Sequence, residues 1–96
     1  MLTKEEIIQT VTEAKIFDSD FFTKVWLIGS FAHDEATEKS DIDFLIKYNK
    51  DELNTKTTTE WSKAITFIET TFFRTVQMIS TEAYERFANS IEILIK

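Results

Sequence analysis

Two aspartates separated by one residue, Asp41 and Asp43, follow a glycine–serine pair, Gly29 and Ser30, in the first half of the chain. Side chains alternate between the two faces of a β-strand, so both carboxylates would project from the same face. Mg²⁺ takes oxygen ligands and typically binds through one or two carboxylates together with the phosphates of a substrate. The spacing therefore predicts a Mg²⁺ site at Asp41 and Asp43.

The glycine–serine pair has the features that a phosphate site requires. Gly29 is the only glycine and follows the apolar segment VWLI. A position without a side chain lets backbone N–H groups approach an anion closely, and Ser30 adds a hydroxyl donor. Each of these residues also has a purely structural interpretation, as a turn, an N-cap or a polar strand face. If all of these residues were purely structural, however, Asp41 and Asp43 would place two like charges on one sheet face without a cation. We therefore favour a nucleotide site.

The elements that position these residues are indicated by caps and periodicity. A capping box at Thr3 and Glu6 predicts a helix over residues 3–16, and a second box at Thr57 and Glu60 precedes another amphipathic helix. Strands are predicted over 24–28, 41–48 and 74–79, with a short helix over 30–35. The last strand is followed by a helix that begins at Ser80 or Thr81 and contains Phe87 and Ala88. The tail, 91–95, either continues this helix or forms a short strand.

This order of elements predicts an α+β fold, in which helices pack on one face of a small mixed β-sheet and the site lies on the other face. The pattern does not define the order or direction of the strands. The chain of 96 residues is long enough for one compact domain and too short for two, so we expect residues 1–96 to form a single domain.

The segment GSFAHDEATEKSDIDFLI resembles the signature of the minimal nucleotidyltransferases of the DNA polymerase β superfamily, which runs approximately GSxARGxAxxxSDIDLLV. A later segment, RTVQMISTEAYERF, is similar to the third strand of the family and the helix that follows it. The resemblance implies a polymerase β palm-like nucleotidyltransferase fold. It also implies that Asp41 and Asp43 hold Mg²⁺ and are catalytic, while Gly29 and Ser30 bind the phosphates of ATP or another nucleoside triphosphate.

Three residues depart from this family pattern. Gln77 falls where the family has a third carboxylate, which completes the metal site and helps to activate the attacking hydroxyl; an amide carries no charge and cannot take a proton. His33 replaces the usual arginine, and we interpret it as a polar surface residue because there is no second histidine and no cysteine for a zinc site. Asp34 replaces the usual glycine, and we interpret it as solvated or interacting with a helix N-terminus. Catalysis is expected to weaken more than binding.

Charge and composition exclude several classes of function. Seventeen acidic and eleven basic residues give a formal charge of −6, so we expect no nucleic-acid substrate. A nucleoside triphosphate remains compatible, since it arrives with Mg²⁺ and meets local donors. The chain lacks both an apolar run approaching the about eighteen residues of a membrane span and the apolar segment of a signal peptide. We therefore expect a cytoplasmic protein without membrane association.

The acceptor of the nucleotide is expected to come from a partner, because the chain has no room for an acceptor-binding domain. Relatives of this kind are commonly encoded beside an all-helical HEPN protein, as a toxin–antitoxin pair in which the transferase attaches AMP to a toxin hydroxyl. The resemblance thus implies a HEPN-type partner and leaves a homo- or hetero-oligomer open. Four phenylalanines exceed what a small sheet easily hides, and some of them are predicted to form a contact patch for a partner: Phe21, Phe22, Phe72 and Phe73.

The leading hypothesis is a Mg²⁺-dependent nucleotidyltransferase that moves AMP from ATP to a hydroxyl on a partner protein, acting as the antitoxin of such a pair. The alternative is a catalytically degenerate domain that silences its partner by binding, which Gln77, His33 and Asp34 favour. A transferase of the aminoglycoside type, acting on a small molecule, is weaker because the acceptor domain is absent.

Overall fold

A computed structural model describes the chain except residues 53–54 and 85–89, and describes only the backbone of residues 52 and 55–57. Its centre is a four-stranded sheet with the order β3-β2-β1-β4. The strand β1 is antiparallel to both β2 and β4, whereas β2 and β3 are parallel. The sheet is therefore mixed, as predicted. The strands span Phe22–Ile28 (β1), Ile42–Tyr48 (β2), Val76–Ser80 (β3) and Ile93–Leu94 (β4).

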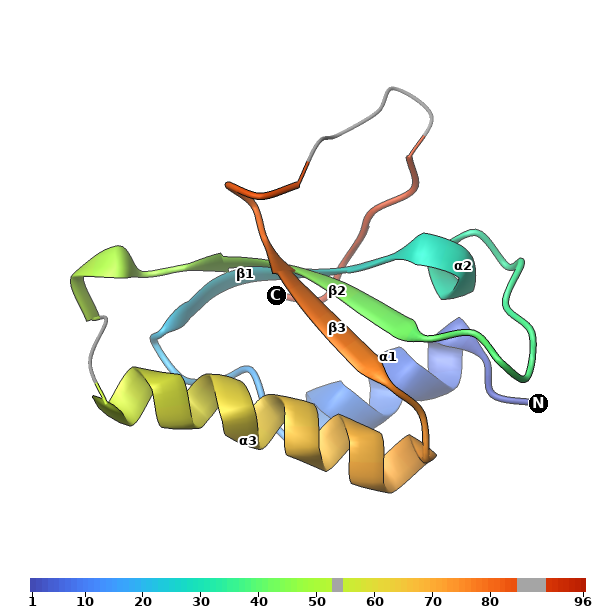
Figure 1. The fold of residues 1–96 in the computed structure, drawn as a ribbon, viewed down its shortest axis with the longest axis horizontal. Coiled ribbons are helices and arrows are strands. Elements are labelled where there is room, and N and C mark those ends of the chain that lie inside the picture. Colours follow the sequence, from blue (N-terminus) through green and yellow to red (C-terminus); the bar gives the residue numbers. More distant parts are fainter. Residues whose placement is uncertain (53–54, 85–89) are drawn as a thin grey trace.

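Two helices, α1 and α3, lie on the same face of this sheet (Figure 1). The predicted cap of α1 is confirmed, because Thr3 Oγ1 accepts a hydrogen bond from the Glu6 N–H at 3.2 Å. The helix ends earlier than predicted, and Lys15 just beyond it has a φ of 57°, which is incompatible with a right-handed helix. The side chain of Thr57 lies outside the described residues. The helical elements span Lys4–Glu13 (α1), Gly29–Ala32 (α2), Lys50–Glu52 (the 3₁₀ helix η1) and Thr55–Phe72 (α3).

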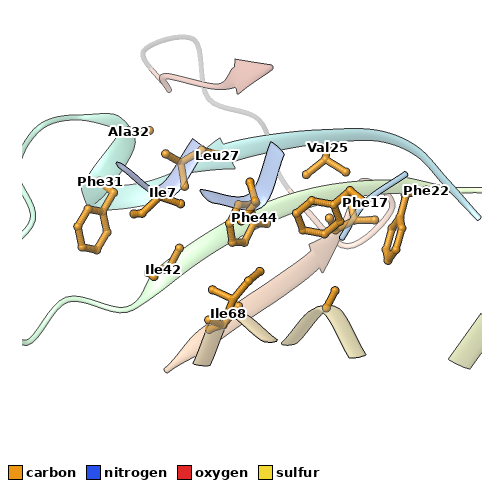
Figure 2. Close-up of a cluster of buried hydrophobic side chains, with 14 of the residues drawn as sticks. Ile7, Phe17, Phe22, Val25, Leu27, Phe31, Ala32, Ile42, Phe44 and Ile68 are labelled. Carbon is orange, nitrogen blue, oxygen red and sulfur yellow. The ribbon is translucent and has the colours of Figure 1, made fainter. Parts of the chain in front are cut away.

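The hydrophobic core lies between the two helices and the sheet (Figure 2). Alternate residues of β2 point into it, and Phe44 is completely buried. The ring of Phe17 meets that of Phe22 edge-to-face, with centroids 5.1 Å apart. The α+β arrangement with helices on one face is thus built as the sequence predicts. Helical residues contribute Ile7, Val11, Ala64 and Ile68 to the core, and β2 contributes Ile42, Phe44 and Ile46.

The four phenylalanines considered for a contact patch differ in exposure. Phe21 and Phe22 are buried, because the connector before β1 folds back and Phe21 stacks on Tyr48 at a centroid distance of 5.4 Å. Phe72 packs partly buried against the core. Only Phe73 is freely exposed, at 90 %, where a φ of 55° just after α3 turns the chain away from the helix.

Of the two predicted alternatives for residues 91–95, a continued helix or a short strand, the structure has the short strand. The tail forms the short edge strand β4, paired with β1. The predicted helix does not begin at Ser80, which belongs to β3, and Thr81 continues the pairing because its N–H donates to the Ile46 carbonyl at 2.9 Å. Residues 81–83 form a turn, while Phe87 and Ala88 lie outside the described residues. Among the helices described, none has the length and apolar character needed to cross a membrane.

Candidate functional site

The candidate site lies at one end of the sheet, where β1 ends and β2 and β3 begin. In the register of the strands, Asp43 is paired with Ile28 on one side and with Gln77 on the other. Paired residues of neighbouring strands project from the same face. Because Ile42 and Phe44 point into the core, Asp43 and Gln77 project from the face that α1 and α3 leave uncovered. The site therefore occupies the face that the sequence predicts.

Gly29 closely approaches the carboxylate of Asp43. It has a φ of 76°, and a Cβ at this position would overlap Oδ2 of Asp43 and lie 3.2 Å from its Cγ. Only glycine satisfies both conditions without strain. The phosphate-binding position and the carboxylate position predicted from the sequence are therefore immediate neighbours in the folded chain, although their roles stay predictions.

The two aspartates differ in exposure and influence each other. Asp41 is exposed just before β2, whereas Asp43 is half-buried within it. Burial raises the pKa of Asp43, and the negative charge of Asp41 raises it further. Both effects disfavour the ionised carboxylate, so the pair would be stabilised by a bound cation. The donor set thus fits Mg²⁺ held between these carboxylates and the phosphates of a nucleotide.

Gln77 is the residue that the sequence aligns with the third carboxylate of the family signature, and this alignment stays a prediction. Its side chain is exposed, and it is the register partner of Asp43 on the neighbouring strand. Across the described part of the chain, no three carboxylate or histidine side chains gather so as to hold a metal ion. An amide oxygen at position 77 can ligate a metal or accept a hydrogen bond, but it cannot take a proton.

Ser30 lies at the start of α2, directly after Gly29. No side-chain hydrogen bond caps this helix at Ile28. Helix N-termini present N–H groups without intrahelical partners, which anions commonly satisfy. The Ser30 hydroxyl and these N–H groups are consequently candidate donors for an anion next to Gly29, which itself lies beside Asp43.

Arg74, which sequence reasoning missed, braces the loop that connects α2 to β2. Its Nη1 donates hydrogen bonds to the carbonyl oxygens of Thr37 and Ser40, at 3.0 and 2.9 Å. Its guanidinium lies over the ring of Phe31, 5.1 Å from the centroid. Because Ser40 directly precedes Asp41, Arg74 fixes the backbone that carries the first aspartate into the site. In the sequence, the only indication that Arg74 binds this loop is its basic side chain just before β3.

Replacement of Arg74 by alanine is expected to lower the free energy of unfolding by about 2 kcal/mol, because two charge-assisted hydrogen bonds and a cation–π contact are lost. Urea denaturation measures this change. Lys63→Ala on the exposed surface of α3 is the matched control and should leave the midpoint nearly unchanged. An Arg74→Ala midpoint equal to that of the control would show that the brace contributes nothing.

Asp34 does not interact with the N-terminus of α2, because it follows the C-terminal end of that helix. It is exposed, consistent with the solvated alternative, and Lys4 Nζ lies 2.8 Å from its Oδ2. This hydrogen bond raises the pKa of Lys4. Asp34 has a φ of 58°, in the left-handed region that favours glycine, which explains why α2 is shorter than predicted.

His33 is half-buried and does more than the predicted surface residue would. Its Nε2 accepts a hydrogen bond from the Ile91 N–H at 3.4 Å. It thereby connects the end of α2 to the segment that leads into β4. His33 was predicted to be a polar surface residue. It is instead half-buried and bonded to the backbone of the C-terminal segment.

Comparison with protein-family models gives a match over residues 5–94 to the family described as Polymerase beta, Nucleotidyltransferase. This span includes the glycine–serine pair, both aspartates and Gln77, and almost the whole chain. Searches of curated proteins and of solved structures found no match.

Proposed function

The chain belongs to the polymerase β nucleotidyltransferase family, and on this basis we propose that it transfers AMP from ATP to a hydroxyl group on a partner protein. Family membership supports nucleotidyl transfer from a nucleoside triphosphate with a divalent metal. The observation that supports the proposal is the close approach of Gly29 to the Asp43 carboxylate, because the residue proposed to bind phosphate then lies beside the residue proposed to hold the metal.

The proposed reaction is an in-line displacement at the α-phosphorus of ATP. The acceptor oxygen forms a bond to phosphorus, the bond to the bridging oxygen of the β-phosphate breaks, and pyrophosphate leaves. Asp41 and Asp43 hold Mg²⁺, which when bound neutralises charge on the phosphates and orients them. Ser30 and the N–H groups of α2 donate hydrogen bonds to phosphate oxygens. Gln77 cannot take the proton of the hydroxyl, so this proton passes to solvent.

The partner in this proposal is a helical protein of the HEPN type, modified as in a toxin–antitoxin pair. The test is to purify the chain with its bound partner and to record intact masses before and after addition of ATP and Mg²⁺. We expect the partner to gain the mass of one AMP group with the wild-type chain and to gain none with Asp43→Asn. A partner that stays bound and unmodified would contradict the transfer.

A degenerate binding module is the second candidate, favoured by the exposed amide at Gln77 in place of a third carboxylate. A module that acts only by binding needs neither Asp41 nor Asp43. The two candidates are therefore separated by asking whether Asp41→Asn and Asp43→Asn chains still silence the partner. Silencing that survives both substitutions would favour the binding module.

Restoring a carboxylate, in the Gln77→Asp variant, is expected to raise the rate of transfer at least about tenfold, since a positioned general base contributes typically 10²- to 10⁴-fold. The measurement is initial rate of pyrophosphate release at saturating ATP and Mg²⁺. Gln77→Asn, which keeps the amide, is the matched control and should not accelerate the reaction. A Gln77→Asp rate no higher than that of the wild type would mean that proton removal does not limit transfer.

A further inference from the structure

A hollow of about 390 Å³ lies on the same sheet face as Asp43, further along the strands. It is lined by Lys24, Trp26, Lys47 and Thr81. Lys47 is four residues beyond Asp43 on β2, which corresponds to about 13 Å along a strand. The alternation of side chains places both residues on the face that α1 and α3 leave uncovered. The hollow is thus within reach of a molecule that also touches the candidate site.

The two lysines of this hollow face each other across the sheet. Lys24 and Lys47 are direct register partners on β1 and β2. Like charges placed directly opposite each other in a sheet are unfavourable. Among the described residues, the salt bridges are Lys4–Asp34 and Lys50–Glu82, so neither Lys24 nor Lys47 has an acidic partner there. A chain with a formal charge of −6 therefore brings two lysines, which form no ion pair with the described acidic residues, to one point of the sheet face that carries Asp43.

An exposed apolar side chain, Leu94, lies beside one residue that lines this hollow. Trp26 lines it, and Leu94 on the edge strand β4 is the register partner of Trp26. Leu94 is 55 % exposed, although it projects beside Trp26 on the same face. We call Lys24, Lys47, Trp26, Thr81 and Leu94 the lysine–tryptophan patch. Its chemistry combines a pair of cations with an exposed aliphatic side chain.

We propose that the lysine–tryptophan patch docks an acidic segment of the acceptor protein, in which carboxylates meet the two lysines and an apolar side chain covers Leu94. This inference rests on the proposed function, because it assigns the acceptor that the transfer requires. In an extended peptide, the acceptor hydroxyl would lie about four residues from the acidic group, which matches the distance of about 13 Å between Lys47 and Asp43.

The patch favours a protein over a nucleic acid as its occupant. Strong nonspecific binding of a polynucleotide requires many phosphate contacts, and two lysines on a chain with a formal charge of −6 do not supply them. The exposed Leu94 offers a polyanion no hydrogen bond, but it suits an aliphatic side chain of a peptide. Charges more than about 10 Å away are screened at moderate salt, so the two lysines dominate at contact range.

The test uses a fluorescein-labelled peptide of alternating glutamate and leucine, with a tyrosine four residues beyond the last glutamate. Its binding to the full chain is measured by fluorescence anisotropy without ATP or metal. We expect the Lys24→Glu, Lys47→Glu double variant to bind at least tenfold more weakly than the wild type. The Lys15→Glu, Lys63→Glu double variant, at two exposed positions outside the patch, is the charge-matched control and should change the affinity less than twofold.

Three results would overturn the proposal: no binding of the peptide to the wild-type chain, equal losses in the patch double variant and in the Lys15→Glu, Lys63→Glu control, or tighter binding of a single-stranded oligonucleotide that also depends on Lys24 and Lys47. The last result would assign the patch to a nucleic acid. Because the assay needs no chemistry, its failure is separate from that of the transfer. If the wild-type chain binds the peptide but transfers no AMP to its partner, only the proposed function is contradicted.

Discussion

Replacement of Gly29 by alanine is expected to lower the free energy of unfolding by about 2 to 4 kcal/mol and to abolish binding of ATP. Two costs combine. The φ of 76° is unfavourable for any residue with a side chain, and the added Cβ would overlap Oδ2 of Asp43. The carboxylate must then move away from the phosphate-binding end of β1, which removes it from the proposed metal site.

Urea denaturation of Gly29→Ala measures the loss, and Ser30→Ala serves as the neighbouring control that leaves the backbone unstrained. A double variant separates the two costs. Asp43→Ala removes the overlapping carboxylate, so Gly29→Ala should destabilise the Asp43→Ala chain less than it destabilises the wild type. Equal losses in both backgrounds would show that backbone conformation alone requires the glycine.

Asp43→Asn is expected to lower the rate of transfer at least about 10²-fold while stabilising the metal-free domain. The rate falls because a ligand of the catalytic metal is lost, and a metal ion supplies several kcal/mol of transition-state stabilisation. The stability rises because burial and the charge of Asp41 raise the pKa of Asp43. Ionised Asp43 therefore opposes folding at neutral pH, and a neutral asparagine removes this penalty.

The sign of the pH dependence follows from the same pKa shift. A carboxylate whose pKa is raised by folding binds its proton more tightly in the folded state. Its contribution to stability is present below the ordinary pKa of an aspartate and is lost as the pH rises through the raised value. The melting temperature of Asp43→Asn should exceed that of the wild type at pH 7, and the difference should shrink toward pH 3.

Without ligand, Asp43→Asn should melt at a higher temperature than the wild type. Addition of Mg²⁺ and ATP should reverse this order of melting temperatures, because it stabilises the wild type and leaves Asp43→Asn nearly unchanged. Asp20→Asn, at an exposed position before β1, is the control and should respond like the wild type. Equal shifts in wild type and Asp43→Asn would place the metal elsewhere.

The sheet and the site were predictable where one local signal decides the structure. Alternation of apolar residues predicted β2 and its buried face, and the signature predicted that Gly29 and Asp43 act together. The order and direction of the strands were not predicted, so the pairing of Gln77 with Asp43 is a finding of the structure, while the alignment of Gln77 with a third carboxylate stays a prediction.

Features that depend on tertiary contacts were not predictable in the same way. Arg74 binds backbone carbonyls, which every residue carries, so the identities of Thr37 and Ser40 gave no signal. Phe21 and Phe22 appeared to be surplus aromatic residues, yet the turn before β1 buries them. The polar residues of that connector gave no indication that its phenylalanines pack into the core.

The measurement that tests the central claim most directly follows the α-phosphate of ATP. The chain and its co-purified partner are incubated with Mg²⁺ and ATP carrying a radioactive label on either the α- or the γ-phosphate. If Asp41 and Asp43 support nucleotidyl transfer, the α-label appears in protein, the γ-label appears in pyrophosphate, and Asp43→Asn abolishes both. A γ-label in protein, or an α-label that Asp43→Asn does not diminish, would contradict the account.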